Sequence, residues 1–281
     1  MIYILYNPKS GNKQTKDKAI ALAAYKKEQT VIGDITLIDD YEKFLSELTE
    51  NDSIIICGGD GTLNKFVNNT DGIENKAEIL YYPTGSGNDF AHDLNHKLDD
   101  EPFIVTNLMK NLPSVMIEGK SYKFLNNVGF GIDGLCCERG EEKKLASDKP
   151  TNYTTTAIKA FLFEFEPRNA TVTVDGVTKE YKKVWMAPTM NGRYFGGGMM
   201  AAPSQKRCDA DKKLSFLILH NISKYKALTI LPKVFTGEHV KHTDVIEIIT
   251  GKEITVTFDK PTSIVIDGEP LPHVTTYTAK L

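Results

Sequence analysis

The sequence predicts an α/β fold followed by a β fold: a Rossmann-like, three-layer α/β domain over residues 1–115 and an antiparallel β-sandwich over residues 116–281. Two observations predict this fold class. In the first part, short apolar runs rich in β-branched residues alternate with helical periodicity, the pattern of parallel βαβ units. After about Pro113, short alternating runs separated by Gly and Asp-Gly turns follow, which is typical of sandwiches and barrels. We expect the active site in a cleft between the two domains.

Each element of the first domain is expected from its hydrophobic period. Ile54, Ile55 and Ile56 form a continuous apolar run, typical of a buried parallel strand. Ile20 and Ala24, by contrast, fall on one face of a helix. The expected elements are strand 2–6, helix 14–28, strand 34–38, helix 41–48, strand 53–56, a helix through Leu63, Phe66 and Val67, strand 78–82, helix 86–94 and helix 100–110.

The second domain is expected to consist mainly of short strands, because its apolar and polar residues alternate. Asp175-Gly176 and Thr250-Gly251-Lys252 mark turns between such strands. Two longer stretches of helical periodicity interrupt the series. The expected elements are strands 114–118, 122–127, 171–174, 183–187, 214–219, 245–249, 254–258 and 263–266, with helices 152–166 and 223–235.

The composition is that of an ordinary globular protein, with 41% hydrophobic and 25% charged residues. A formal net charge of −3 argues against nonspecific nucleic-acid binding, which needs a basic surface. No run of about 18 apolar residues occurs and no basic stretch precedes the first apolar run, so we expect neither a transmembrane segment nor a signal peptide. The four cysteines lack metal-ligand spacing. We therefore expect a cytoplasmic protein with reduced cysteines.

A glycine-rich turn, Gly58-Gly59-Asp60-Gly61-Thr62, directly follows the clearest strand and precedes a helix. Glycines let backbone N–H groups approach an anion, and the positive end of the following helix also favours phosphate. Asp60 would repel phosphate unless a cation such as Mg²⁺ lies between them. A tight turn in which Asp60 only caps the helix remains the alternative.

Two further glycine-containing turns end expected strands, at Asn7–Lys13 and at Pro83–Phe90. In an alternating β/α chain, all three turns would meet at the carboxyl edge of one sheet, where open α/β sheets bind ligands. Thr62 or Ser86 as helix caps, and Asn7 in an Asx turn, are the structural alternatives. The chain has no Gly-x-x-x-x-Gly-Lys-Ser/Thr motif and is therefore not a P-loop protein.

These turns, including Asn7-Pro8 with Ser10-Gly11 and Pro83–Ala91, resemble the nucleotide-binding signatures of the diacylglycerol kinase family. The similarity is to its bacterial soluble lipid kinases, which are related to sphingosine and ceramide kinases. Later motifs extend it over nearly the whole chain: Asn127–Asp133, Asn191-Gly192 with Gly196–Gly198, Gly237–His239 and Ile266–Leu271. The Gly-Gly-Asp-Gly-Thr turn alone also occurs in NAD kinases, but the other motifs favour a lipid kinase.

The resemblance implies an ATP- and Mg²⁺-dependent lipid kinase that phosphorylates a lipid hydroxyl, with diacylglycerol converted to phosphatidic acid. It implies peripheral contact with a membrane surface and leaves the oligomeric state open, a homodimer among the alternatives. The implied nucleotide-binding residues are Asn7, Pro8, Ser10, Gly11, Gly58, Gly59, Asp60, Gly61, Thr62, Asn64, Thr84, Gly85, Ser86 and Asn88.

Two other functions stay open. An NAD kinase-like protein would use the same turn with a soluble acceptor. A nucleotide-binding regulatory module would have lost catalysis, but retention of both Asp267 and Glu269 argues against it.

Asp267-Gly268-Glu269 follows an apolar strand and, as a bare sequence, reads as a hairpin turn. The resemblance implies that this pair supplies the general base. Spacing does not decide between the two carboxylates; we favour Glu269, with Asp267 as the alternative.

Two metal sites are implied. Asp60 and Asp89 lie on neighbouring turns and would share one Mg²⁺, with a helix cap as the alternative for Asp89. Asp209 and Asp211 fall where the family has an Asp-Gly loop for a structural Mg²⁺. The expected Gly is absent here and Lys212-Lys213 follow, which puts the second site in doubt. His92 also replaces a frequent Arg of the family.

Overall fold

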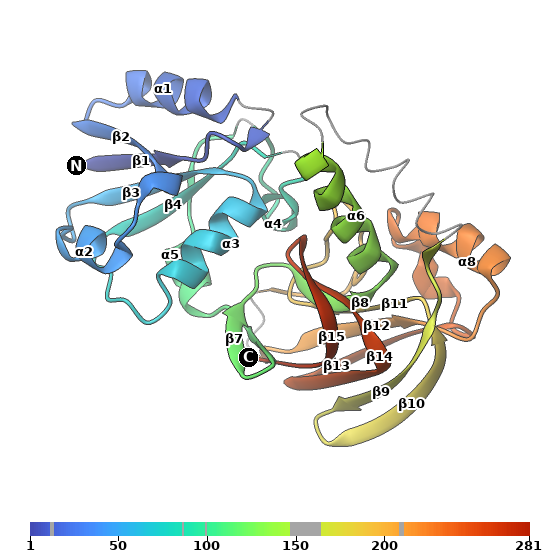
Figure 1. Cartoon of the computed structure of the whole chain (residues 1–281). Coiled ribbons are helices and arrows are strands. Elements are labelled where there is room, and N and C mark those ends of the chain that lie inside the picture. The colour runs from blue at the N-terminus through green and yellow to red at the C-terminus, as the bar shows by residue number, and fades with distance from the viewer. Residues whose placement is uncertain (12–13, 86, 99, 147–163, 208–210) are drawn as a thin grey trace. The chain divides into compact units, whose positions relative to one another are not determined.

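The computed structural model describes the chain apart from residues 12–13, 86, 99, 147–163 and 208–210. The chain divides into two compact units, Met1–Leu112 and Pro113–Leu281 (Figure 1). The first unit is mixed α/β, and the second consists mainly of antiparallel strands, as the sequence predicts.

The first unit is a five-stranded sheet of order β2-β1-β3-β4-β5, in which the first four strands run parallel and β5 is antiparallel to β4. Figure 1 shows α1 on one side of this sheet and α2, α3 and α5 on the other, which gives three layers. The strands are β1 Ile2–Tyr6, β2 Thr30–Asp34, β3 Ser53–Gly58, β4 Glu78–Pro83 and β5 Phe103–Ile104. The helices are α1 Thr15–Tyr25, α2 Tyr41–Ser46, α3 Asp60–Asn69, α4 Asp89–Asp93 and α5 Thr106–Lys110.

The strand predicted at 34–38 is wrong. The strand β2 ends at Asp34, and Ile35–Leu37 form a 3₁₀ turn instead. The reason is local, because the Asp34 carboxylate accepts hydrogen bonds from the Thr36 backbone N–H at 2.9 Å and from its hydroxyl at 2.7 Å. That Asx-type turn bends the chain away from the sheet. The helix predicted at 100–110 is also shorter than expected and is limited to α5.

The second unit contains a ten-stranded sheet of order β13-β12-β11-β8-β14-β15-β6-β7, with β9 paired to both β10 and β14. The long strand β14 joins the two layers of the sandwich, because its first half pairs with β9 and its second half with β8. The strands are β6 Ser114–Ile117, β7 Lys120–Lys123, β8 Asn127–Gly131, β9 Arg168–Val174, β10 Val177–Val184, β11 Met186–Met190, β12 Leu214–Leu219, β13 Ile246–Gly251, β14 Glu253–Ile266 and β15 Glu269–Lys280.

Two apolar clusters stabilise the second unit. The first lies inside the sandwich, where the ring of Phe130 is 4.6 Å from that of Phe258 and 5.4 Å from that of Tyr277, measured between centroids. The second lies on the outer face of β11 and β12, where helical segments cover Trp185 and Met186. These segments are α6 Ile132–Ala146, α8 Lys224–Ile230 and the 3₁₀ turns η4 Leu231–Val234 and η5 Glu238–Lys241.

Several predicted elements of the second unit differ from the observed ones. The predicted strand 122–127 falls on the end of β7 and the start of β8, and 183–187 falls on the junction of β10 and β11. The predicted helix 223–235 is confirmed as α8 and η4. Helix 152–166 lies outside the described residues as far as residue 163. No helix among the described residues is long and apolar enough to cross a membrane.

Candidate active site

The three glycine-containing turns of the first unit lie together at the carboxyl edge of its sheet. They follow β1, β3 and β4, which are neighbours in the sheet. The Asn7 backbone N–H donates to the Cys57 carbonyl at 3.2 Å, and the Thr84 N–H donates to the Gly58 carbonyl at 2.8 Å. The hydrogen bonding between neighbouring strands therefore continues into the first residues of the turns.

Side-chain hydrogen bonds fix the first two turns to each other. The Asn7 side-chain amide donates to the Thr62 hydroxyl at 2.9 Å, and the Gly59 N–H donates to the Ser10 hydroxyl at 3.1 Å. Thr62 is almost fully buried. These bonds hold Gly59 at the N-cap of α3, where backbone N–H groups of the first helical turn lack intrahelical partners.

Glycine is required where the turns touch. A Cβ at Gly85 would collide with the Cα of Gly59 and come within 3.1 Å of its nitrogen. A Cβ at Gly11, where φ is +56°, would collide with the Thr84 carbonyl. The turns therefore leave no room for side chains where they touch, and α3 begins at this edge with its positive end, which suits an anion.

Asp60, the first residue of α3, links its turn to the next one. Its carboxylate accepts hydrogen bonds from the Phe90 backbone N–H at 3.2 Å and from the Tyr81 hydroxyl at 3.4 Å. Phe90 lies in the first turn of α4, so the Asp60 carboxylate caps α4, whereas the N-cap of its own helix α3 is Gly59. Burial, and then the negative charge of Asp60, raise the pKa of Tyr81 well above its usual value, which keeps its hydroxyl protonated as a donor.

Asp89 is buried at the start of α4 and lies close enough to Tyr81 to raise the pKa of that hydroxyl further. Two carboxylates near an edge of backbone N–H groups fit Mg²⁺, which proteins usually bind through one or two carboxylates together with substrate phosphate oxygens. The described residues contain no cluster of three or more His, Cys, Asp or Glu side chains with metal-ligand geometry.

Other residues predicted to bind nucleotide make hydrogen bonds within the turns. The Thr84 hydroxyl lies 3.1 Å from that of Thr15, and both residues are buried. The Asn88 side chain accepts from the Gly85 N–H at 3.1 Å and donates to its carbonyl at 2.7 Å, which closes the Pro83–Asn88 turn. Asn64 is buried and accepts from the Asn68 amide. Ser86 lies outside the described residues.

In the second unit, Asp267 and Gly268 form the two-residue turn between β14 and β15. Their φ angles are +46° and +89°, and Ile266 pairs directly with Glu269. Positive φ at both positions is the geometry of a type I′ hairpin, for which Asp-Gly is a preferred sequence. The hairpin interpretation of this motif is confirmed.

The Asp267 carboxylate accepts three backbone hydrogen bonds. The donors are the N–H groups of Leu125, Asn126 and Asn127, at 2.5, 2.7 and 3.0 Å. Burial raises the pKa of Asp267, and these donors together with the nearby positive charge of Arg207 oppose that rise. The carboxylate therefore fastens the hairpin to the segment that leads into β8.

Arg207 and Asn191 support the same segment and were not predicted to do so. The Arg207 guanidinium donates to the Leu125 carbonyl and, at 2.8 Å, to the Asn126 side chain. The Asn191 amide donates to the Leu125 carbonyl at 2.8 Å. The sequence marks Asn191 only as part of an Asn-Gly motif and Arg207 only as part of the basic pair Lys206-Arg207.

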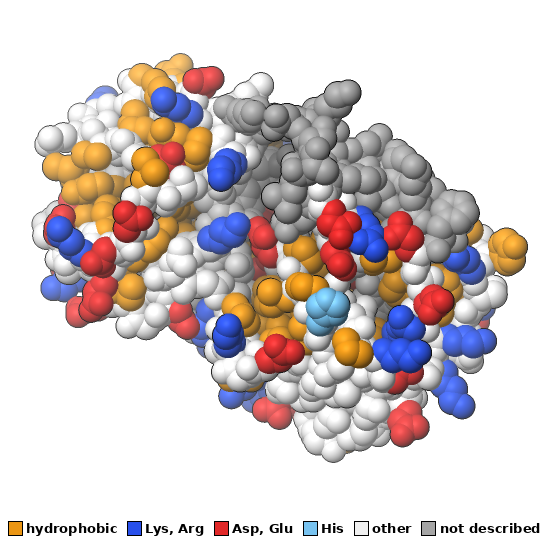
Figure 2. Space-filling model, in the orientation of Figure 1, with side chains coloured by type: hydrophobic (Ala, Val, Ile, Leu, Met, Phe, Trp, Pro, Cys, Tyr) orange, Lys and Arg blue, Asp and Glu red, His pale blue; other side chains and the backbone are white. Residues whose placement is uncertain are grey.

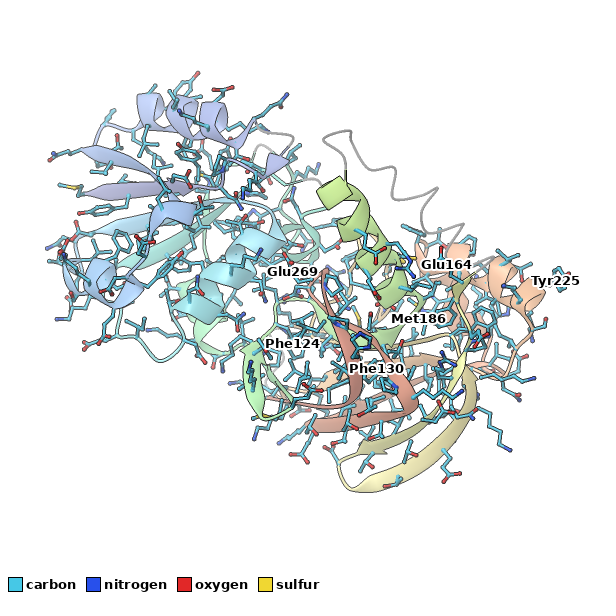
Figure 3. The ribbon with its side chains drawn as sticks, viewed as in Figure 1. Phe124, Phe130, Glu164, Met186, Tyr225 and Glu269 are labelled. Atoms are coloured by element: carbon cyan, nitrogen blue, oxygen red, sulfur yellow. The ribbon has the colours of Figure 1, made fainter. Side chains whose placement is uncertain are left out.

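Glu269 is the first residue of β15 and is partly buried. Figure 3 shows it at the tip of the β14–β15 hairpin. Its predicted role as general base stays a prediction. Of the second predicted metal site, Asp209 lies outside the described residues and Asp211 is exposed.

Two family matches cover almost the whole chain. Residues 1–117 match the diacylglycerol kinase catalytic domain, and residues 126–279 match the YegS C-terminal NAD kinase beta sandwich-like domain. The chain belongs to the diacylglycerol kinase family.

Similar proteins carry related names. "Putative lipid kinase YtlR" of Bacillus subtilis (strain 168) is 25% identical over 231 residues, which cover 77% of this chain and 73% of that protein. A diacylglycerol kinase of Mycobacterium tuberculosis (strain CDC 1551 / Oshkosh) is 23% identical over 240 residues, covering 79% of this chain and 72% of its own. A crystal structure of a diacylglycerol kinase from Bacillus anthracis str. Sterne has a TM-score of 0.66 at 21% identity, over 99% of this chain and 93% of that one, and so has the same fold.

Proposed function

We propose that this protein is an ATP-dependent lipid kinase that transfers the γ-phosphate of ATP to a lipid hydroxyl, with diacylglycerol as the acceptor and phosphatidic acid as the product. The observation that carries the proposal is the meeting of three glycine-containing turns at one sheet edge. Membership of the diacylglycerol kinase family supports the same reaction. Since ATP is the phosphate donor, the reaction takes place in the cytoplasm.

For the nucleotide, the proposal assigns the phosphates to the N-terminal end of α3, which the Gly58–Thr62 turn forms, and to the Pro83–Asn88 turn beside it. The hydrogen bonds from Asn7 to Thr62 and from Gly59 to Ser10 support this assignment, because they fix the conformation of the Gly58–Thr62 turn before ligand arrives. Asp60 and Asp89 would hold Mg²⁺, which supplies neutralisation of phosphate charge.

For the acceptor, we assign Glu269 as the general base. The lipid hydroxyl oxygen bonds to the γ-phosphorus, the bond from that phosphorus to the β,γ-bridging oxygen breaks, and ADP leaves. The hydroxyl proton passes to the Glu269 carboxylate. Asp267 is the less suitable base, because its oxygens already accept hydrogen bonds from three backbone N–H groups. We assign it a positioning role for the hairpin.

The test is transfer of labelled phosphate from ATP, in the presence of Mg²⁺, to a set of acceptors: dioleoylglycerol and ceramide in mixed micelles, and NAD in solution. We expect labelled phosphatidic acid from the wild type. Glu269→Gln should lose this activity, whereas its matched control Glu180→Gln, which changes an exposed carboxylate on β10, should retain it. Transfer to NAD alone would replace the lipid kinase proposal with an NAD kinase, and nucleotide binding without any transfer would indicate a regulatory module.

A further inference from the structure

The helical segment formed by α8 and η4 is apolar on two opposite sides. Ala227, Ile230 and Val234 are buried in the outer apolar cluster of the second unit. On the other side, Tyr225 is 83% exposed, Leu228 41% and Phe235 54%. Figure 3 shows Tyr225 projecting away from α8 and from the body of the unit.

We call the exposed set Tyr225, Leu228, Pro232 and Phe235 the α8 ridge. Its members recur at intervals of three and four residues, so they share one face of the helical segment. A surface helix of a soluble domain needs only one apolar side. The second apolar side is therefore unexplained by the fold and indicates a partner.

The segment that contains the α8 ridge is basic. The segment 223–244 contains Lys224, Lys226, Lys233 and Lys241 against Glu238 and Asp244, a formal charge of +2 in a chain whose total is −3. Lys226 pairs with Asp244 at 2.6 Å, and Lys241 pairs with Glu238 at 3.0 Å. The positive charge of the segment runs against the acidic balance of the whole chain and complements an anionic surface.

We propose that the α8 ridge docks on an anionic phospholipid bilayer, with the apolar side chains entering the interface and the lysines at head-group level. Helices that lie on membranes combine these two features, and tyrosine is enriched at the membrane interface. A protein partner fits less well, because lysine is depleted in protein–protein interfaces. The biological purpose of the contact rests on the proposed function, since a bilayer would carry the acceptor lipid.

The experiment measures binding of the full chain to vesicles of phosphatidylcholine and phosphatidylglycerol by co-sedimentation, without ATP. The test variant is Tyr225→Ser/Leu228→Ser/Phe235→Ser. The matched control is Tyr25→Ser/Leu37→Ser/Ile104→Ser, whose targets are 86%, 75% and 57% exposed in the first unit. We expect the test variant to lose at least about tenfold in partition coefficient and the control to bind as the wild type. Raised salt should weaken binding of the wild type.

A second readout uses fluorescence. The chain contains one tryptophan, Trp185, which is buried and supplies a constant background. Tyr225→Trp adds an exposed reporter on the ridge, and its emission should shift to shorter wavelength when anionic vesicles are added. No shift would contradict insertion of this side chain.

Absence of vesicle binding by the wild type, or equal binding by the test variant, would overturn the proposal. A test variant that dissociates from dimer to monomer while still binding vesicles would make the ridge an interface between copies, which also overturns it. These results are independent of phosphate transfer. Vesicle binding without kinase activity would refute the proposed function alone, and activity on a short-chain, monomeric diacylglycerol without vesicle binding would refute the docking alone.

Discussion

Asp267 and Glu269 are two residues apart in the sequence but have different surroundings. The Asp267 carboxylate is held by three backbone N–H groups, whereas Glu269 stands at the tip of the hairpin (Figure 3). We therefore expect Asp267→Asn to lower the free energy of unfolding by about 2 kcal/mol, since an amide nitrogen would face backbone donors. Glu269→Gln should leave it unchanged. Urea denaturation measures both, and equal stability of the two variants would contradict the positioning role of Asp267.

The close approach of Gly85 and Gly59 brings two of the glycine-containing turns together. Alanine at position 85 would push the turns apart, because its Cβ would collide with Gly59. We expect Gly85→Ala to weaken ATP binding by at least about tenfold, measured by calorimetry. Gly33→Ala is the control: its Cβ would meet only the Leu5 side chain at 3.3 Å. Unchanged ATP affinity in Gly85→Ala would contradict the proposal that ATP binds at this edge of the sheet.

Asp133, in the first turn of α6, predicts a pH dependence of stability. Both of its carboxylate oxygens are buried, and burial raises the pKa of this group to about 6, although the backbone N–H groups of Asp133 and Gly134 oppose that rise. Since the folded pKa lies above the unfolded value of about 3.9, the protonated form favours folding, and its contribution is lost as pH rises from about 4 to about 6.

Asp133→Asn removes this buried charge. We therefore compare the free energy of unfolding of the variant with that of the wild type at two pH values. We expect this difference to favour the variant by about 2 kcal/mol more at pH 7.5 than at pH 4.5. Asp39→Asn, an exposed carboxylate, should show the same small effect at both pH values. Urea denaturation at both pH values measures this, and a pH-independent effect of Asp133→Asn would contradict the raised pKa of Asp133.

At the scale of single residues, the meeting of the three glycine-containing turns was predictable. Each turn follows a recognisable strand, and the carboxyl ends of parallel strands lie at the same edge of a sheet. The support of the Asp267 hairpin was not predictable. It depends on hydrogen bonds from residues about 140 positions earlier in the chain and on Arg207, which the register of β8 and β14 brings together. The pairing of strands so far apart in the sequence cannot be read from a local sequence pattern.

Among the elements, α6 approaches β14 most closely at Gly134 and also contacts it through Glu138. A Cβ at Gly134 would collide with the Ser263 carbonyl, and the Ser263 hydroxyl donates to Glu138 one helical turn later. We expect Gly134→Ala to displace α6 and to cost about 1–3 kcal/mol of unfolding free energy. Urea unfolding followed by emission of Trp185, which packs in the apolar cluster under α6, would detect it. If Gly134→Ala unfolds with the same free energy as the wild type, the close packing of Gly134 on Ser263 does not contribute to stability.

Elements with a continuous apolar run or clear periodicity were predictable, as β3, β4 and β12 illustrate. Two segments could not be predicted in this way. The run Ile35–Leu37 is apolar enough for a strand, but the Asp34 turn overrides it. The strand β15 carries Pro270 and Pro272, which break the alternating pattern, although its pairing with β14 extends to Lys280.

For the whole molecule, the two units carry different parts of the proposed chemistry. The first presents backbone N–H groups and two carboxylates at a sheet edge, and the second presents Glu269 on a hairpin fastened by Asp267. Figure 2 shows basic and acidic side chains interspersed on the visible face of both units, as expected for a chain whose net charge is only −3. The sequence predicted the order of the units, because each has its own hydrophobic period.

The central claim is that this chain transfers phosphate from ATP to a lipid hydroxyl with Glu269 as the base. The most direct measurement is single-turnover formation of phosphatidic acid from ATP and dioleoylglycerol by the wild type and by Glu269→Gln, with the ATP dissociation constant measured in parallel. We expect the transfer rate to fall about 10²- to 10⁴-fold in Glu269→Gln while ATP binding is unchanged. Transfer at the wild-type rate would contradict the role of Glu269, and ATP binding by a wild type that transfers to no lipid would contradict the kinase itself.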